Sequence, residues 1–207
     1  MSPAAEIVAL GSSFFGRGLT FGRTGNLSAV DADGTILMTP TGVSLGRLDT
    51  TTLSRVAPDG AHLDGPPPTK EAFLHLAMYR ARPGARAVVH THSTYSVAVS
   101  CLRNADRENA LPPLTAYYAM RVGALPLLPY HAPGDDRLGP LAERVAGEHH
   151  ALLLANHGPV VAGADLAAAA DALEEIEETA KLYLLLQGHV TSPVADDEAA
   201  RLRRRSR

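Results

Sequence analysis

The segment 87-AVVHTHSTYSVAV-99 places two histidines at the end of a run of small and branched apolar residues. This run predicts a buried strand over residues 86–92, followed by a helix over 94–102. Side chains alternate between the two faces of a strand, so His90 and His92 point to the same face and can share one ligand. Two imidazoles stand where two valines would be expected, and a ligand would explain them.

A third histidine, His157, lies in the turn 156-NHGP-159 between two predicted buried strands. Three neutral imidazoles can bind a divalent metal ion at about 2.0–2.1 Å, and three protein ligands leave the open position of a catalytic site. Such a set suits zinc, with manganese, cobalt or iron as alternatives. The ordinary alternative is that His-x-His lies on an exposed strand and that Asn-His-Gly only forms a turn.

The rest of the chain predicts an α/β domain on a mixed sheet, because strands alternate with helices and hairpins. Asp31-Ala32-Asp33-Gly34 predicts a hairpin turn, and the proline-rich segment 111–135 predicts short strands and turns. Helices are predicted over residues 3–17, 66–83, 138–148 and 165–188, the second with Thr69 as its N-cap.

Length and composition indicate one domain over residues 1–207, with 193–207 as a frayed or disordered tail. The net charge of −3 gives no sign of a nucleic-acid or membrane partner. No apolar run approaches the ~20 residues that span a bilayer. The single cysteine, Cys101, suits the cytoplasm, and its apolar neighbours predict that it is buried.

Five motifs resemble those of the class II aldolase/adducin superfamily in order and spacing. They are 25-GNLS-28, 39-TPTG-42, 68-PTKEAFLH-75, 83-PGARAVVHTHS-93 and 156-NHG-158. The resemblance covers roughly residues 5–190. It implies a three-layer α/β/α domain around a central mixed, largely antiparallel sheet. It also implies a homotetramer with active sites between subunits.

The resemblance also implies the site residues. One divalent metal per subunit, zinc first, would be held by His90, His92 and His157. Glu71 would be the general acid/base and a further ligand in the empty site. The substrate phosphate would be bound by Asn26, Thr41, Gly42, Thr69 and Lys70, and loop amides at a helix N-terminus do form anion sites.

Lys70 and Tyr117 each allow two interpretations. In the fuculose-phosphate aldolase type, positions 69 and 70 are typically Ser-Ser, whereas here they are Thr69 and Lys70. Lys70 could bind the substrate phosphate or form an ion pair with a second negative charge on the substrate. Tyr117 matches a tyrosine that neighbouring subunits contribute in that type, and packing is an equal alternative for it. His75 is expected beside Glu71 rather than on the metal, and His131 could line the site.

The segments 43–56, 93–102 and 109–135 look most like the 3-oxo-tetronate 4-phosphate decarboxylases. That resemblance implies a phosphorylated sugar acid as substrate, with dihydroxyacetone phosphate and carbon dioxide as products, through a metal-stabilised enediolate. The main alternative is an L-fuculose-1-phosphate type aldolase. A ribulose-phosphate epimerase fits less well, because it normally has aspartate at position 71. More distant alternatives are a methylthioribulose-phosphate dehydratase and a non-catalytic adducin-like binding module.

Overall fold

The computed structural model describes residues 1–205. Its elements, in chain order, are α1 Pro3–Gly16, β1 Asn26–Val30, β2 Ile36–Met38, the 3-10 helices η1 Leu45–Arg47 and η2 Thr50–Thr52, β3 Ser54–Val56, β4 His62–Asp64, α2 Ala72–Ala81, β5 Ala87–His90, α3 Thr94–Ser100, α4 Ala116–Arg121, β6 Leu127–Leu128, α5 Leu138–Ala146, β7 Ala151–Leu154, β8 Gly158–Gly163, α6 Leu166–Leu185 and α7 Asp196–Arg205.

Within the described chain the strands form one eight-stranded sheet in the order β4-β3-β2-β1-β5-β8-β7-β6. Its strand pairs are antiparallel except for β6 and β7, which run parallel. The predicted hairpins β1–β2 and β7–β8 are both present. The expectation of a mixed, largely antiparallel sheet is therefore confirmed.

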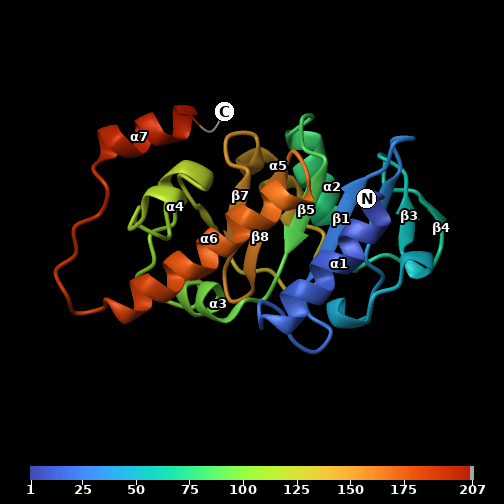
Figure 1. Cartoon of the computed structure of the whole chain (residues 1–207), viewed down its shortest axis with the longest axis horizontal. Helices are drawn as coiled ribbons and strands as arrows, with labels where there is room; N and C mark the ends of the chain where they lie inside the picture. Colours follow the sequence, from blue (N-terminus) through green and yellow to red (C-terminus); the bar gives the residue numbers. More distant parts are fainter. Residues whose placement is uncertain (206–207) are drawn as a thin grey trace.

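Helices cover both faces of this sheet, which makes three layers. α1 and α6 lie side by side on the near face in Figure 1. They share a core with strand residues such as Val89. α2 and α5 pack on the opposite face, in a core that contains Val88 and Val160. Adjacent residues of β5 thus serve opposite cores, as the two-residue period of a strand requires.

The start of α2 differs from the prediction. The helix begins at Ala72, with Glu71 rather than Thr69 at the N-cap position. Thr69 is held outside the helix because its N–H donates to the Thr39 carbonyl at 3.1 Å, and Pro68 forms a bridge with Pro40. The Thr69 hydroxyl still accepts from the Glu71 N–H at 3.3 Å. It therefore orders the turn before the helix instead of capping it.

Two further elements differ from the sequence-based expectation. β5 ends at His90, two residues before the predicted end, so His92 lies beyond the regular strand. The segment 111–135 contains the helix α4, which was not predicted. Thr115 accepts from the Tyr118 N–H as its N-cap, and Gly123 follows its end with φ +79°. These capping signals are present in the sequence but stand among prolines.

The C-terminal part of the described chain forms α7, which packs against α4 and buries Ala199. The tail 193–207 was expected to be frayed or disordered, but residues 196–205 of it form this packed helix, and residues 206–207 lie outside the described residues. Cys101 is exposed, contrary to the prediction, because it follows the last turn of α3 at the surface. No helix among the described residues is long and apolar enough to cross a membrane.

Candidate metal centre

Four side chains from three separate parts of the fold converge in one place. Glu71 stands at the N-cap position of α2, His90 ends β5, His92 follows it, and His157 lies in the β7–β8 turn. Their potential ligand atoms all lie within 4.8 Å of one another. The three imidazole ring centroids are 4.6–5.0 Å apart. The structure thus brings together the four residues predicted to hold a metal.

The register of the central strands explains this convergence. His90 lies opposite Asn26 of β1 on one side and opposite Val160 of β8 on the other. Directly opposed residues point to the same face, and Val160 belongs to the core beneath α2. His90 therefore points toward the layer of α2 and α5, and Glu71 lies in that layer at the start of α2.

Two glycines allow the backbone to close around the histidines. A Cβ at Gly25 would lie 2.9 Å from the His90 carbonyl oxygen, and one at Gly158 would lie 2.3 Å from the Thr91 carbonyl oxygen. Their φ angles of +79° and +145° also favour glycine. Asn156 adopts the left-handed conformation that asparagine tolerates, with φ 58°. The NHG sequence is thus explained by the backbone that presents His157.

The hydrogen bonding of His90 and His157 fits a metal site. His90 Nδ1 lies 2.8 Å from the Pro159 carbonyl oxygen, which can only accept, so Nδ1 carries the proton. His90 Nε2 therefore holds the lone pair. His90 Nε2 and His157 Nε2 are both buried without a hydrogen-bond partner. A buried nitrogen atom without a hydrogen-bond partner costs free energy. A cation bound to the nitrogen lone pair would remove this cost.

The Glu71 carboxylate completes the cluster. Its Oε1 lies 3.0 Å from His157 Nε2 and its Oε2 3.4 Å from His90 Nε2. Burial raises the pKa of Glu71, but the neighbouring His157 and the hydrogen bond from the amide of Asn26 hold it well below its ordinary value. Glu71 is therefore ionised in this arrangement.

The histidines have the protonation state that metal binding needs. Burial, only partly offset by the Glu71 charge, lowers the pKa of His90 to about 4. Burial and the neighbouring His90 and His157 lower the pKa of His92 to about 3. Both imidazoles are thus neutral at pH 7 and have a lone pair for a cation.

A buried chain of hydrogen bonds leads away from Glu71 along the sheet. Asn26 Nδ2 donates to Glu71 Oε2 at 2.8 Å, and Asn26 Oδ1 lies 2.5 Å from His75 Nε2. Ser28 Oγ lies 2.7 Å from His75 Nδ1 and 2.8 Å from the Tyr79 hydroxyl. Because the carboxylate requires a donor, each proton in the chain points toward Glu71.

In this network His75 lies beside Glu71 and is not one of the four residues of the candidate metal site, as expected. Burial lowers the pKa of His75 to about 4, so it is a neutral link. Ser28 and Tyr79 were not predicted. The spacing of Glu71, His75 and Tyr79 at intervals of four residues was a usable signal, because it puts them on one face of α2.

The residues expected to bind phosphate lie on two adjoining segments. The Thr41 N–H donates to the Pro67 carbonyl at 3.1 Å, so residues 39–42 lie beside the turn before α2. Thr41, Gly42 and Lys70 are exposed, whereas Thr69 is buried. Asn26 is also buried, and both ends of its side-chain amide are already bonded within the chain. One amide N–H of Asn26 remains for a ligand.

Tyr117 does not join the cluster within the described chain. It lies on α4 with 58% of its surface exposed, and the Arg121 guanidinium stands 5.7 Å from its ring centroid. His131 lies in the loop before α5, where Asp135 Oδ2 is 3.3 Å from its Nδ1. A Cβ at Gly134 of the same loop would lie 3.8 Å from Lys70 Cβ, so this loop adjoins the segment that leads into Glu71.

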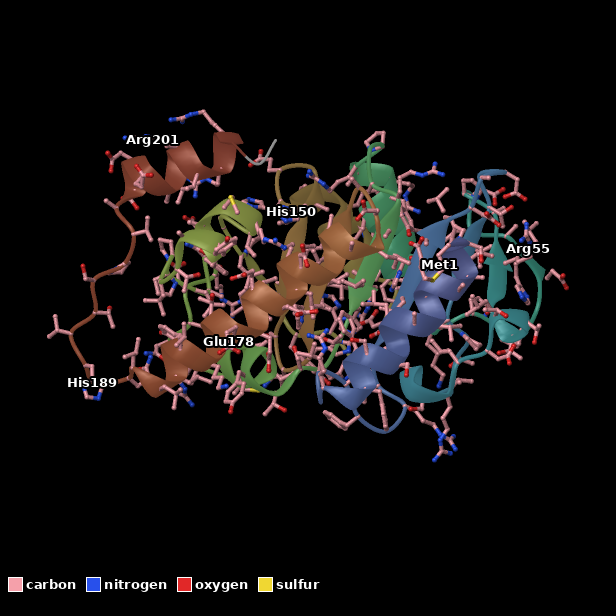
Figure 2. The ribbon with its side chains drawn as sticks, in the orientation of Figure 1. Met1, Arg55, His150, Glu178, His189 and Arg201 are labelled. Atoms are coloured by element: carbon pink, nitrogen blue, oxygen red, sulfur yellow. The ribbon has the colours of Figure 1, made fainter. Side chains whose placement is uncertain are left out.

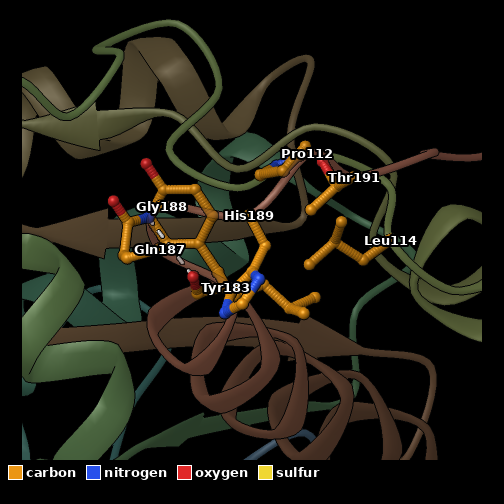
Figure 3. A pocket seen from close by; sticks show the side chains of 8 residues that line it. Pro112, Leu114, Tyr183, Gln187, Gly188, His189 and Thr191 are labelled. Carbon is orange, nitrogen blue, oxygen red and sulfur yellow. Dashed lines mark hydrogen bonds between the residues drawn. The ribbon is translucent and has the colours of Figure 1, made fainter.

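A hollow with a volume of about 200 Å³ lies elsewhere, between residues 112–114 and the end of α6. Figure 3 shows its lining, which includes Tyr183, Gln187 and His189. None of the residues predicted for the site lines it, so we attach no catalytic role to it.

The sequence matches the model of a known family. Residues 5–184 match the Class II Aldolase and Adducin N-terminal domain. The chain belongs to this family, and the resemblance inferred from its motifs is confirmed.

Three relatives place the chain within the family. It is 50% identical over 198 residues to a 3-oxo-tetronate 4-phosphate decarboxylase from Pectobacterium atrosepticum, which covers 96% of this chain and 91% of that protein. It is 33% identical to an L-fuculose phosphate aldolase from Escherichia coli, over 88% of this chain and 84% of that one. The crystal structure of YgbL from Escherichia coli superposes with a TM-score of 0.94 at 47% identity, over 97% of both chains.

Proposed function

We propose that this protein is a metal-dependent decarboxylase that converts a 3-oxo-tetronate 4-phosphate to dihydroxyacetone phosphate and carbon dioxide. The observation that carries the proposal is the intact cluster of three histidines and the buried carboxylate of Glu71. The 50% identity to a decarboxylase of that name supports the substrate. An adducin-like module without catalysis has no need for this cluster.

The metal would be held by His90, His92 and His157, with Glu71 beside them, and zinc is the first candidate. A divalent cation supplies Lewis-acid polarisation of substrate oxygens. In the proposed reaction the C1–C2 bond of the substrate breaks and carbon dioxide leaves. The electron pair of the broken bond stays on the substrate and forms an enediolate across C2 and C3. We assign the proton transfer that follows to Glu71. Glu71, after taking up one proton from water, delivers it to C2, which yields dihydroxyacetone phosphate.

The substrate phosphate would lie against Thr41, Gly42 and Thr69, with Asn26 beneath them. The adjoining segments 39–42 and 67–70 support this, because they offer backbone and hydroxyl groups at the start of α2. Lys70 is exposed at this position. A substrate with both a carboxylate and a phosphate gives Lys70 a negative partner at either end.

The activity is tested by incubating the protein with zinc, manganese or cobalt and each synthetic 3-oxo-tetronate 4-phosphate, of erythro and threo configuration. We expect one dihydroxyacetone phosphate and one carbon dioxide for each substrate consumed. L-fuculose 1-phosphate serves as the comparison substrate. Release of dihydroxyacetone phosphate from that ketose alone, without carbon dioxide, would establish the aldolase instead.

The single domain is further proposed to assemble as a homotetramer with active sites between subunits. The exposed ring of Tyr117 supports this, because a tyrosine that serves a neighbouring subunit must lie at the surface of its own chain. We expect light scattering to give four times the 21.8 kDa of one chain. A fully active monomer would contradict both the assembly and the assignment of Tyr117. The cytoplasmic location stays a prediction from the single cysteine.

A further inference from the structure

We propose that Glu177 of α6 is a positioning residue that holds His92 in place for the metal. The proposal rests on the proposed metal site. Among its three histidines, His90 is fixed by strand pairing on both sides, and His157 is fixed in a tight turn. His92 lies beyond the end of β5, so regular strand pairing does not hold it.

The residues that alternate with the histidines point to the opposite layer. Thr91 and Ser93 are buried, and the Thr91 hydroxyl donates to Ser93 Oγ at 3.2 Å. Ser93 Oγ in turn lies 3.5 Å from Ser96 Oγ, at the start of α3. The segment that carries His90 and His92 on one face is therefore tied by hydroxyl groups on its other face.

Glu177 is the end point of these contacts. Its Oε1 accepts from the Tyr95 N–H at 2.9 Å, and its Oε2 accepts from the Ser96 N–H at 2.8 Å and from Ser96 Oγ at 2.5 Å. Glu177 is only 8% exposed, although it lies in the acidic run 174-EEIEE-178. Hydrogen bonds to an ionised acceptor are roughly twice as strong as neutral ones.

These contacts join two layers of the fold across a long stretch of sequence. α6 packs on β5, β8 and α3, so Glu177 has a rigid base from which to fix residues 93–96. Residues outside the ligand set commonly determine metal affinity by orienting the ligands. Glu177 acts in this way through the backbone of the ligand segment, without touching the metal.

Cobalt binding to the whole protein, without substrate, tests the proposal in Glu177→Gln. An amide nitrogen cannot accept, so one donor of residues 95–96 loses its partner. We expect cobalt affinity to fall about 10–100-fold, as is usual for outer partners of a metal site, with a shifted visible absorption of the bound cobalt. Thermal unfolding of the metal-free proteins shows whether the variant has folded.

Glu178→Gln is the matched control. Glu178, labelled in Figure 2, is the next residue on α6, is exposed and lies 3.7 Å from Lys181, whose ammonium group is 5.8 Å from the Tyr95 ring centroid. The variant removes the same charge and leaves the hydrogen bonds of residues 95–96 to Glu177 in place. It should bind cobalt like the unmodified protein. Unchanged cobalt affinity and spectrum in Glu177→Gln would overturn the proposal.

Two further outcomes are decisive. If Glu177→Gln does not fold, Glu177→Asp replaces it, because that variant keeps the charge but shortens the reach to the donors of residues 95–96. Weaker cobalt binding by Glu177→Asp supports the proposal, and unchanged binding overturns it. If the unmodified protein binds no cobalt, zinc or manganese, the metal site itself is refuted and the role of Glu177 falls with it.

Discussion

His92→Ala is expected to lose the bound metal and with it nearly all activity. The unmodified protein should contain about one divalent ion per chain, whereas the variant should contain far less after purification. The loss should exceed the roughly 10–100-fold that follows removal of an outer partner, because His92 would bind the ion directly. Elemental analysis and the carbon dioxide assay measure the two effects.

The fold should survive this substitution. His92 is the least buried histidine of the cluster and lies outside the strand ladder, so alanine there removes no regular hydrogen bond. His189→Ala is the control, since His189 is exposed beyond the end of α6 (Figure 2). A metal-free preparation that retains full activity would show that the four residues do not form a metal centre.

The sequence predicts this centre well because local rules place most of its parts. The two-residue period of a strand aligns His90 with His92, even though regular pairing ends between them. The turn of the β7–β8 hairpin presents His157, and its glycine marks a close backbone approach. Local rules do not predict which helices and strands lie next to one another. That part of the prediction came from the order of the family motifs.

The errors arise where distant contacts override a local preference. Thr69 has the chemistry of an N-cap, but its pairing with Thr39 keeps it out of the helix. Glu177 was not singled out from the sequence, and only the packing of α6 on α3 reveals it as a buried acceptor. A pattern confined to one segment cannot report a partner some eighty residues away.

Glu71→Gln is expected to lower activity by ~10²–10⁴-fold, or roughly 3–5 kcal/mol of barrier, while the protein keeps its metal and its fold. Glutamine matches the volume of glutamate and can still accept from Asn26 Nδ2, which donates to Glu71 at 2.8 Å. It cannot exchange a proton at pH 7. The three histidines remain to hold the metal.

The environment of Glu71 explains how an ionised carboxylate can become a proton donor. Burial raises its pKa, and the contacts with His157 and Asn26 reverse this. In the proposed reaction the substrate would displace Glu71 from the histidines, so that burial, which raises its pKa, would act against the charge of the metal, which lowers it. The carboxylate would take up one proton from water and deliver it to C2.

Activity and metal content of Glu71→Gln should therefore separate, and Glu178→Gln should change neither. If Glu71→Gln lost its metal as completely as His92→Ala, its loss of activity would follow from the loss of the ion. Glu71 would then act mainly as a metal ligand. A variant that kept its metal and turned over within a few-fold of the unmodified protein would remove Glu71 as the proton carrier. Tyr117 and His131 would then be the residues to replace next, Tyr117 because it can reach a neighbouring site, and His131 because its loop adjoins Lys70.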